Sequence, residues 1–392
     1  MPIAPVGAAG DPTGTVPLVS APLTVRSGRV LTASGWAARD VALDGERIVT
    51  GHTTTRVLDA TGLLVAPGFV DVQCNGAFGV DLAAEPERVD EVAARLPEVG
   101  VTAWCPTLVT SPPDRFERLR AAVATSPAPG AARALGLHLE GPLLAPQRRG
   151  AHRPELLRMP GAVDASRWTR ADGVALVTLA PELPGALGLI ARLRASGVTV
   201  SVGHTAASPA QLDAAFAAGA RTVTHLCNGM PPFHHRSPGP VGWALAHRRV
   251  VAGLIADGVH VDPLALAALH AALGPARTLL VSDAVAPAGL PGAADAERLR
   301  DGTLAGGTML LDQCVRNLVA FTGCSAAAAV RSVTAVPARV LGRRDRGRIA
   351  PGYVAELTLL TPDLHVVGTV IGDVVSAALR ERVTTPTSSR AH

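Results

Sequence analysis

The chain has 392 residues and a formal net charge of only +4, and it is 48% hydrophobic but 3% aromatic. This length allows one large domain and a smaller one. It shows no long basic stripe with aromatic stacking platforms, which argues against nucleic-acid binding. We find no signal-peptide pattern and no uninterrupted apolar run of about 18 residues, so we expect no membrane span.

The cysteines argue against a disulfide framework. They are odd in number, scattered along the chain and without the spacing of a cysteine zinc site. We therefore expect a protein of the reducing cytoplasm. The five are Cys74, Cys105, Cys227, Cys314 and Cys324.

The chain begins with a segment rich in glycine, proline and alanine, and we predict a disordered tail over residues 1–20. Short β-type runs then recur as far as Val65, and Asp44-Gly45 is a strong hairpin signal between two of them. The predicted strands are Leu23–Val25, Val30–Thr32, Ala38–Leu43 and Arg47–Thr50.

Beyond Pro67 the pattern changes to eight short apolar runs, most of which are followed by a helical pattern. Strands that alternate with helices over about 250 residues predict a parallel (β/α)₈ barrel, for which we assign residues 67–342. A doubly wound sheet is the alternative. The predicted strands are Gly68–Val72, Thr102–Leu108, Ala134–Leu139, Val174–Leu179, Thr199–Val202, Thr222–Thr224, Val250–Ile255 and Thr278–Ser282.

Two of the predicted helices carry clear end signals. Ser208 and Gln211 form a capping-box pattern, and Gly219 follows as a stop. Asp262 precedes a proline at the first helical position of the next helix, and Gly274 ends it. A longer helical region, Asp312–Val340, follows the barrel strands.

The last part of the chain returns to β character. We expect residues 343–385 to pair with residues 21–66, so that both ends of the chain build one small β-sandwich domain with the barrel inserted between them.

Chemically capable side chains stand at nearly every predicted strand end. In a barrel the carboxyl ends of the strands meet at one mouth, where active sites lie. A single histidine or aspartate at such a place is more often a hydrogen-bonded core residue or a turn cap, but the regularity favours a site. The residues are Asp71, Gln73, Thr107, His138, Glu140, Glu182, His204, His225, Asn228, Asp257, His260 and Asp283.

The densest polar segment is Thr224–Gly239, which reads THLCNGMPPFHHRSPG. A β-branched run leads into His225, and prolines keep the following residues out of regular structure. The segment is therefore predicted to be a strand that delivers a histidine to a stiff polar loop. Taken alone, it could equally be a turn with surface histidines.

Taken in order, the motifs resemble those of the N-acetylglucosamine-6-phosphate deacetylases of the amidohydrolase superfamily. The resemblance implies a (β/α)₈ barrel with a small β-sandwich and a deacetylase active in amino sugar catabolism. The matching motifs are residues 67–76 (PGFVDVQCNG), 138–142 (HLEGP), 203–205 (GHT), 225–230 (HLCNGM), 234–236 (HHR), 257–260 (DGVH) and 282–284 (SDA).

The resemblance implies one metal ion held by Glu140, His204 and His225. One carboxylate and two imidazoles leave room for a water, which is the usual layout of catalytic zinc. Many amidohydrolases carry HxH at the end of strand one, but here Gln73 and Asn75 stand there and favour a single metal. We expect Zn²⁺, although such ligands also suit iron, manganese or cobalt.

By the same resemblance, Asp283 is the general base and acid, and His260 stabilises the oxyanion. The resemblance also implies a homodimer in which Arg236 reaches the sugar phosphate of the neighbouring subunit. The substrate-binding residues implied are Ala151, His152, Asn228, Gly229, Arg236, Asp257, His260, Leu304, Ala305 and Gly306.

Three alternatives stay open at this point. A related amidohydrolase could act on the galacto epimer, since no motif recognises the C4 hydroxyl of the sugar, or on a cyclic amide. A non-catalytic barrel could serve as a scaffold, although such relatives typically lose metal ligands or the last aspartate. A second metal is disfavoured by Gln73 and Asn75.

Overall fold

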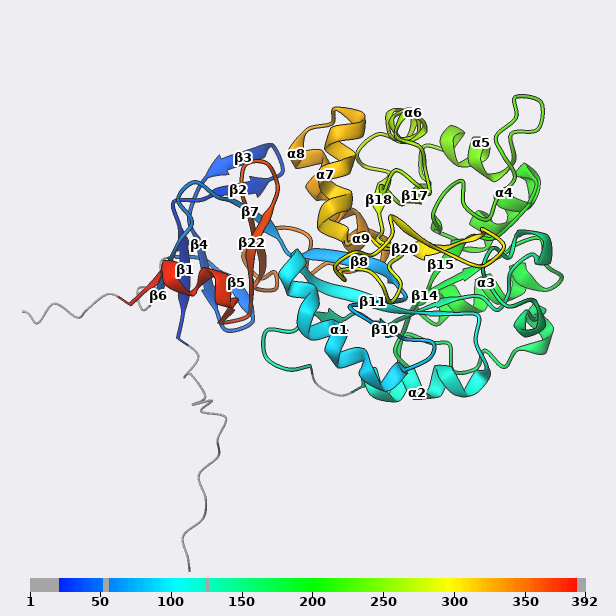
Figure 1. Cartoon of the computed structure of the whole chain (residues 1–392), viewed down its shortest axis with the longest axis horizontal. Coiled ribbons are helices and arrows are strands. Elements are labelled where there is room, and N and C mark those ends of the chain that lie inside the picture. The colour runs from blue at the N-terminus through cyan, green and yellow to red at the C-terminus, as the bar shows by residue number, and fades with distance from the viewer. Residues whose placement is uncertain (1–20, 52–55, 125–126, 386–392) are drawn as a thin grey trace, which may run out of the picture.

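The computed structural model describes residues 21–51, 56–124 and 127–385, and the predicted tail 1–20 lies outside these residues. Two small sheets stand beside one large barrel (Figure 1). Among the described residues, no helix is long and apolar enough to cross a membrane. All five cysteines are free thiols.

The barrel strands run in parallel in the order in which they occur along the chain, apart from the short edge strand β12 (Arg133–Ala134). A bridge between Cys74 of the first strand and Ala284, just beyond the last strand, brings the two together at the carboxyl end of the barrel, so the ring is nearly closed. The eight-stranded barrel is thereby confirmed. Its strands are β8 (Phe69–Cys74), β11 (Val101–Val109), β13 (Leu137–Glu140), β14 (Val174–Leu179), β15 (Thr199–Val202), β16 (Thr222–Val223), β17 (Val251–Leu254) and β18 (Thr278–Leu280).

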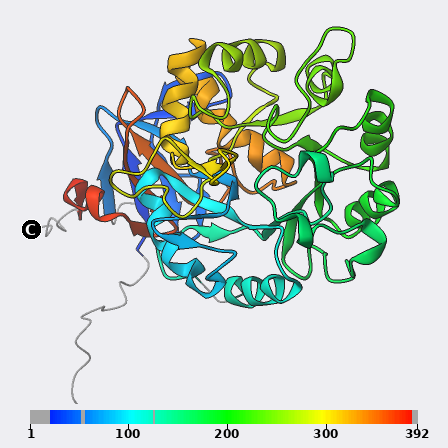
Figure 2. The same cartoon turned by 45° about the vertical axis from the view of Figure 1, so that its right-hand side comes forward.

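Helices surround the strands on the outside of the barrel (Figure 2). The capping box of Ser208 and Gln211 is formed, and Asp262 caps the helix after it with its side chain. Both boundary predictions were therefore right. The helices are α1 (Val89–Arg95), α2 (Pro113–Val123), α3 (Ala186–Ala195), α4 (Pro209–Ala218), α5 (Gly239–Ala246), α6 (Pro263–Leu273), α7 (Leu311–Thr322), α8 (Ala326–Ser332) and α9 (Ala335–Val340).

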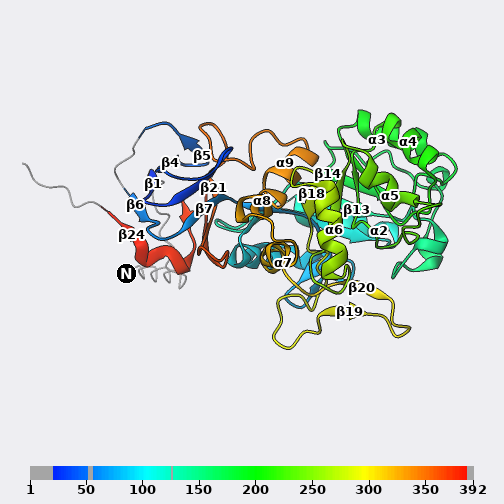
Figure 3. The ribbon, with the colours of Figure 1, turned by 90° about the horizontal axis from the view of Figure 1, so that it is seen from above.

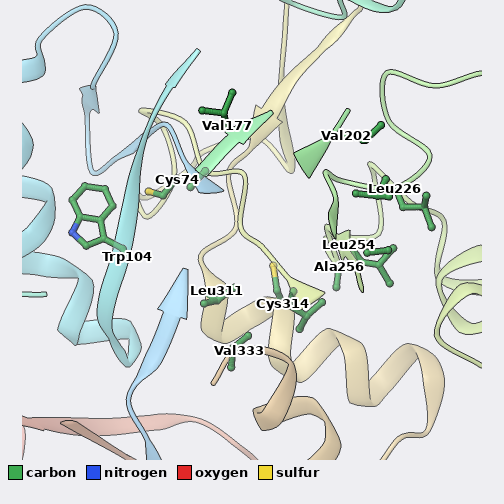
Figure 4. Close-up of a cluster of buried hydrophobic side chains, with 14 of the residues drawn as sticks. Cys74, Trp104, Val177, Val202, Leu226, Leu254, Ala256, Leu311, Cys314 and Val333 are labelled. Atoms are coloured by element: carbon green, nitrogen blue, oxygen red, sulfur yellow. The ribbon is translucent and has the colours of Figure 1, made fainter. Parts of the chain in front are cut away.

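The barrel core joins strands to helices. Figure 4 shows Val177, Val202 and Leu254 from three strands in the same buried cluster as Leu311 and Cys314 of α7. Inside the barrel, polar hydrogen bonds also link successive strands: His138 contacts Thr107 and Thr178. Burial lowers the pKa of His138 to about 4, so this histidine is a neutral core residue.

Both ends of the chain build the two small sheets. The six-stranded sheet has the order β23-β22-β21-β7-β2-β3, and the five-stranded sheet has the order β24-β6-β1-β4-β5. The predicted pairing of the chain ends is thus present, because β21 pairs with β7 and β24 pairs with β6. The strands are β1 (Leu23–Arg26), β2 (Arg29–Thr32), β3 (Gly35–Ala38), β4 (Val41–Asp44), β5 (Arg47–Val49), β6 (Arg56–Asp59), β7 (Leu64–Pro67), β21 (Glu356–Leu360), β22 (Val366–Ile371), β23 (Val374–Val375) and β24 (Val383–Thr384).

One strand prediction in this region was wrong. The run Ala38–Leu43 is not one strand, because β3 ends at Ala38 and β4 begins at Val41 in the other sheet. The charged pair Arg39-Asp40 interrupts the apolar residues at this change of sheet. The hairpin at Asp44-Gly45 is present between β4 and β5.

A separate antiparallel hairpin, β19 (Ala296–Arg298) and β20 (Leu304–Gly307), stands at the mouth of the barrel (Figure 3). It is anchored where Ala284 bridges Gly307 and where Gly307 donates its N–H to the Asp283 carbonyl. A further two-stranded hairpin, β9 (Gly76–Ala77) and β10 (Val80–Asp81), follows the first barrel strand.

Candidate active site

A cavity of about 1030 Å³ opens at the carboxyl ends of the barrel strands. Its walls come from the loops after β8, β11, β13, β15, β16, β17 and β18 and from the β19–β20 hairpin. This is the mouth at which (β/α)₈ barrels carry their active sites. The predicted residues that line it are Asn75, Glu140, Ala151, His152, His204, His225, Asn228, Gly229, His260, Asp283, Leu304, Ala305 and Gly306.

Glu140, His204 and His225 converge at the floor of this cavity. Glu140 Oε1 lies 2.9 Å from Nε2 of His225 and 3.3 Å from Nε2 of His204. With bonds of 2.0–2.2 Å, tetrahedral ligand atoms stand about 3.4 Å apart. The three buried side chains therefore offer one oxygen and two nitrogens at a spacing that suits one metal ion.

The protonation of Glu140 also suits a metal site. Burial alone would raise its pKa, but the closely placed His204 and His225 imidazoles hold the pKa of this carboxyl well below its usual range. The side chain is thus an anion in the interior. Its charge can be balanced by a cation or by a protonated imidazole.

A third histidine, His152, also lies near Glu140 and His204, and the group whose ligand atoms are all mutually close contains His152 and not His225. Glu140, His152 and His204 each offer one atom within 4.8 Å of the others. Hydrogen bonds show that His152 and His204 carry their protons on different ring nitrogens. The Thr110 backbone N–H donates to His152 Nδ1, so the proton of neutral His152 is on Nε2 and the ring presents a donor.

His204 has the opposite tautomer. Its Nδ1 lies 2.9 Å from the carbonyl oxygen of Arg148, which can only accept, so Nδ1 carries the proton and Nε2 has the free lone pair. Burial, reinforced by nearby His204, lowers the pKa of His152 to about 3, which keeps His152 neutral. His152 therefore presents a hydrogen-bond donor, whereas His204 presents the free lone pair that metal ligation requires.

His225 completes the set. Its Nδ1 is buried and has no hydrogen-bond partner among the described residues, while Nε2 faces Glu140. Without a cation, Glu140 raises the pKa of this imidazole to about 9 against the effect of burial. A metal ion would take the place of that proton.

Three of the site residues have left-handed backbones. The φ angles are 47° for His204, 22° for His225 and 48° for Asp283. Such angles cost about 1–3 kcal/mol in residues other than glycine and are found most often at functional sites. The strand ends thus turn sharply here, and the turns aim three side chains at one point.

Asp283 is held by two amides. Gln73 Nε2 donates to Asp283 Oδ1 at 2.9 Å, and Asn75 Nδ2 donates to the same oxygen at 2.8 Å. The other oxygen, Oδ2, has no described partner. Burial, together with the charge of Glu140, raises the pKa of Asp283 to about 6. One oxygen is therefore fixed, and the other can exchange a proton.

Gln73 itself does not line the cavity. It lies beneath Asp283 and also donates to Glu140 Oε1 at 3.0 Å. Deeper still, Ser282 donates its hydroxyl to Asp71, which joins the last strand to the first, and burial raises the pKa of Asp71 to about 7. Asp71 thus supports the site and does not enter it.

His260 is oriented by Asp257. Its Nδ1 lies 2.6 Å from Asp257 Oδ2, and Asp257 also accepts the backbone N–H groups of Val259 and His260. Asp257 is not among the residues that line the cavity, and its contacts orient His260; its predicted contact with substrate stays a prediction. Glu182, also predicted at a strand end, instead holds the loop after β15 by accepting the Ala206 N–H.

Arg236 lies outside the cavity. It is exposed on the loop after β16, and its guanidinium contacts only His235 among the described residues. Phe233 on the same loop is 58% exposed. Within one chain, therefore, Arg236 does not reach the residues that line the mouth.

The sequence analysis missed several lining residues. Thr110 sets the tautomer of His152, and Arg115, Arg153 and Arg298 add positive charge to the cavity wall. Arginines are spread throughout this lysine-free chain, so no local pattern distinguished these three. Thr110 lies one residue beyond the end of β11, and this position was the only available signal.

The model of the Amidohydrolase family matches residues 64–376. The chain is 37% identical to the N-acetylglucosamine-6-phosphate deacetylase of Rattus norvegicus, over 88% of this chain and 92% of that protein. It is 36% identical to the N-acetylgalactosamine-6-phosphate deacetylase of Escherichia coli O157:H7, over 87% and 96%. A structure of the Mycobacterium smegmatis N-acetyl-D-glucosamine-6-phosphate deacetylase in complex with N-acetyl-D-glucosamine-6-phosphate has a TM-score of 0.79 and 33% identity, over 91% and 98%.

Proposed function

Because the chain belongs to the amidohydrolase family, and within it to the N-acetylglucosamine-6-phosphate deacetylases, we propose that it hydrolyses N-acetyl-D-glucosamine 6-phosphate to acetate and D-glucosamine 6-phosphate. The observation that carries this proposal is the meeting of Glu140, His204, His225 and Asp283 at one cavity floor. The relatives described above all act on amino sugar phosphates, which favours this reaction over a cyclic amide or a scaffold role.

We infer that Glu140, His204 and His225 hold one divalent cation, most simply Zn²⁺, while iron, manganese or cobalt would suit the same donors. Such an ion lowers the pKa of water and polarises a carbonyl. Gln73 and Asn75 turn their amide nitrogens to Asp283, so these groups act as donors where other amidohydrolases carry metal-binding histidines. This supports one ion per subunit.

Asp283 moves the proton in this mechanism. Its free Oδ2 would take a proton from the attacking water and pass it to the leaving amine of the sugar. The two amide donors keep Oδ1 occupied, so the same oxygen serves both steps. A pKa in the middle of the pH range suits a group that must both accept and donate.

His260 and His152 supply the hydrogen bonds. Asp257 can only accept at Oδ2, so Nδ1 of His260 carries a proton and Nε2 is left for the cavity. His260 would donate from Nε2 to the acetamide oxygen as an imidazolium, whose charge Asp257 would balance, as negative charge develops. His152 presents its Nε2 proton toward the sugar.

We propose that the enzyme is a homodimer in which Arg236 crosses to the neighbouring cavity and binds the phosphate. A guanidinium suits two phosphate oxygens at once. Its exposed position, outside its own cavity and beside the exposed Phe233, supports this arrangement. The reducing cytoplasm stays the expected compartment.

Acetate release tests the reaction. We expect N-acetylglucosamine 6-phosphate to be hydrolysed with about one metal per chain, and Asp283→Asn to lower kcat by about 10²–10⁴-fold while retaining the metal. The galacto epimer serves as the second substrate. A metal-loaded protein that hydrolyses only the epimer would overturn the sugar assignment, and one that hydrolyses neither would overturn the reaction.

Subunit mixing tests the dimer. Arg236→Ala and Asp283→Asn each remove a different part of the site. If Arg236 acts across the interface, a mixed dimer of the two inactive variants contains one intact site, so remixing should restore about a quarter of the wild-type activity. Two variants that stay inactive after verified subunit exchange would contradict the shared site.

A further inference from the structure

A second cavity, of about 550 Å³, lies at the opposite end of the barrel from the catalytic mouth. Its lining comes from residues before or at the start of β14, β15, β16 and β17 and from α9 and the residues after it. Five arginines line it, and no aspartate or glutamate does among the described residues. They are Arg170, Arg194, Arg221, Arg249 and Arg339.

The arginines are set in place by the fold. Arg170, Arg221 and Arg249 lie just before β14, β16 and β17, and Arg194 lies in the last turn of α3, before β15. These strands are neighbours in the barrel, so the fold brings the four side chains to one end of it. Two glycines let the side chains lie close to the backbone. A Cβ at Gly219 would stand 2.4 Å from Arg194 Cδ, and one at Gly197 would stand 3.2 Å from Arg170 Cβ.

Two of the five are anchored by carbonyl groups. Arg170 donates to the carbonyl oxygens of Leu135 and Leu341, and Arg339 donates to that of Ala276. Burial lowers the pKa of the Arg170 guanidinium, and the charge of nearby Arg343 lowers it further. The described part of the chain supplies no hydrogen bond or ion pair to the side chains of Arg194, Arg221 and Arg249.

Some arginines elsewhere on the surface are neutralised by carboxylates: Arg88 pairs with Glu85 and Glu91, and Arg118 pairs with Glu87. What distinguishes this cavity is that five guanidinium groups without a described carboxylate partner line one hollow. Clefts lined by charges of one sign concentrate ions of the opposite sign.

We propose that this cavity is a binding site for a small anion with at least two phosphoryl groups. Guanidinium groups bind phosphate oxygens in pairs, and five of them can neutralise several negative charges. The volume suits a phosphorylated metabolite. The site is separate from the catalytic mouth, because its residues lie before or at the start of the strands and the catalytic residues follow them.

The test compares two double variants by calorimetric titration with pyrophosphate. Arg194→Gln/Arg249→Gln removes two lining charges. Arg192→Gln/Arg248→Gln removes two exposed charges from the same two segments, outside the cavity, and is the matched control. We expect at least tenfold weaker binding in the lining variant and less than twofold change in the control. All three proteins should keep the same kcat and KM.

Pyrophosphate that enters the catalytic mouth would bind all three proteins alike, so only the difference between the variants reports on this cavity. Equal loss in both variants would show a general effect of charge and would overturn the proposal. Undetectable pyrophosphate binding by the wild type would do the same. If single-stranded RNA bound the lining variant more weakly than the control while pyrophosphate bound both alike, the ligand of this cavity would be a nucleic acid, and the proposed metabolite would be wrong.

Discussion

At the scale of single residues, the site depends on which atom each side chain presents. Thr110 and the Arg148 carbonyl give His152 and His204 opposite tautomers, although both rings lie beside Glu140. Gln73 has a comparable role, because one amide nitrogen contacts both Glu140 and Asp283. Residues that orient the reacting groups in this way often matter nearly as much as the groups themselves.

We expect Gln73→Met to lower kcat by about 10–100-fold with little change in KM, because the substitution removes the donor that fixes Asp283 and keeps the side-chain length. Steady-state kinetics and metal content would be measured together. Gln147→Met, at an exposed position, is the control. A variant with nearly normal kcat would show that Asn75 alone suffices to orient Asp283.

The sequence located most of these side chains, because parallel strands of a barrel end at one mouth. It could not separate those that enter the cavity from those beneath it. Asp71, His138 and Glu182 also stand at strand ends, but each makes a hydrogen bond away from the cavity. Asp71 accepts from a serine, His138 contacts a threonine, and Glu182 accepts from a backbone N–H. Such contacts depend on distances between strands that are far apart in the chain.

At the scale of elements, the β19–β20 hairpin forms one wall of the cavity and is packed tightly against the end of strand eight. Gly306 has a φ of +142°, and a Cβ there would stand 2.5 Å from Val285 Cγ1 and 2.9 Å from the Asp283 carbonyl oxygen. The hairpin can therefore keep its place only with glycine at this position.

Gly306→Ala should push the hairpin away from Asp283 and lower kcat/KM at least tenfold, since a displacement of about 1 Å near reacting groups can cost about 10²-fold. Gly292→Ala is the matched control, because Gly292 also has a left-handed φ but open space around it. Its kcat/KM should change less than twofold. Similar losses in both would assign the effect to backbone strain.

Sequence patterns predicted the strands and helices of the barrel well, because capping residues and buried runs are local signals. The hairpin was not predicted. Its first strand, Ala-Glu-Arg, has neither the length nor the alternation of a typical strand, and it forms because Gly307 docks onto the Asp283 loop. Tertiary contact, which no window of sequence contains, decides its structure.

At the scale of the whole molecule, a buried ion pair joins the small sheets to the barrel. Arg346 donates to Glu356 Oε2 at 2.8 Å, and Thr102 of the barrel strand β11 donates to the same carboxylate. Arg133 approaches the other oxygen at 3.6 Å. We propose that this contact fixes the boundary between a small domain, 21–66 with 343–385, and the barrel, 67–342.

We expect Glu356→Gln to reduce the free energy of unfolding by about 3 kcal/mol, because it leaves the buried Arg346 without its counter-charge. Glu46→Gln removes an exposed partner of Arg133 and should change stability by less than about 1 kcal/mol. Urea unfolding would measure both. Equal, small effects would mean that Asp345, 3.7 Å from Arg346, compensates.

The pairing of the two chain ends also sets an order of events during synthesis. Strand β7 leaves the ribosome early, but its partner β21 follows about 290 residues later, since Leu357 pairs with Pro67. At a translation rate of about 5–20 residues per second, the edge of β7 stays unpaired for roughly 15–60 s before β21 is synthesised. For that time, the nascent chain carries an open sheet edge that can pair with other chains. Yield in the cell should therefore depend on chaperones that cover the first 67 residues during translation.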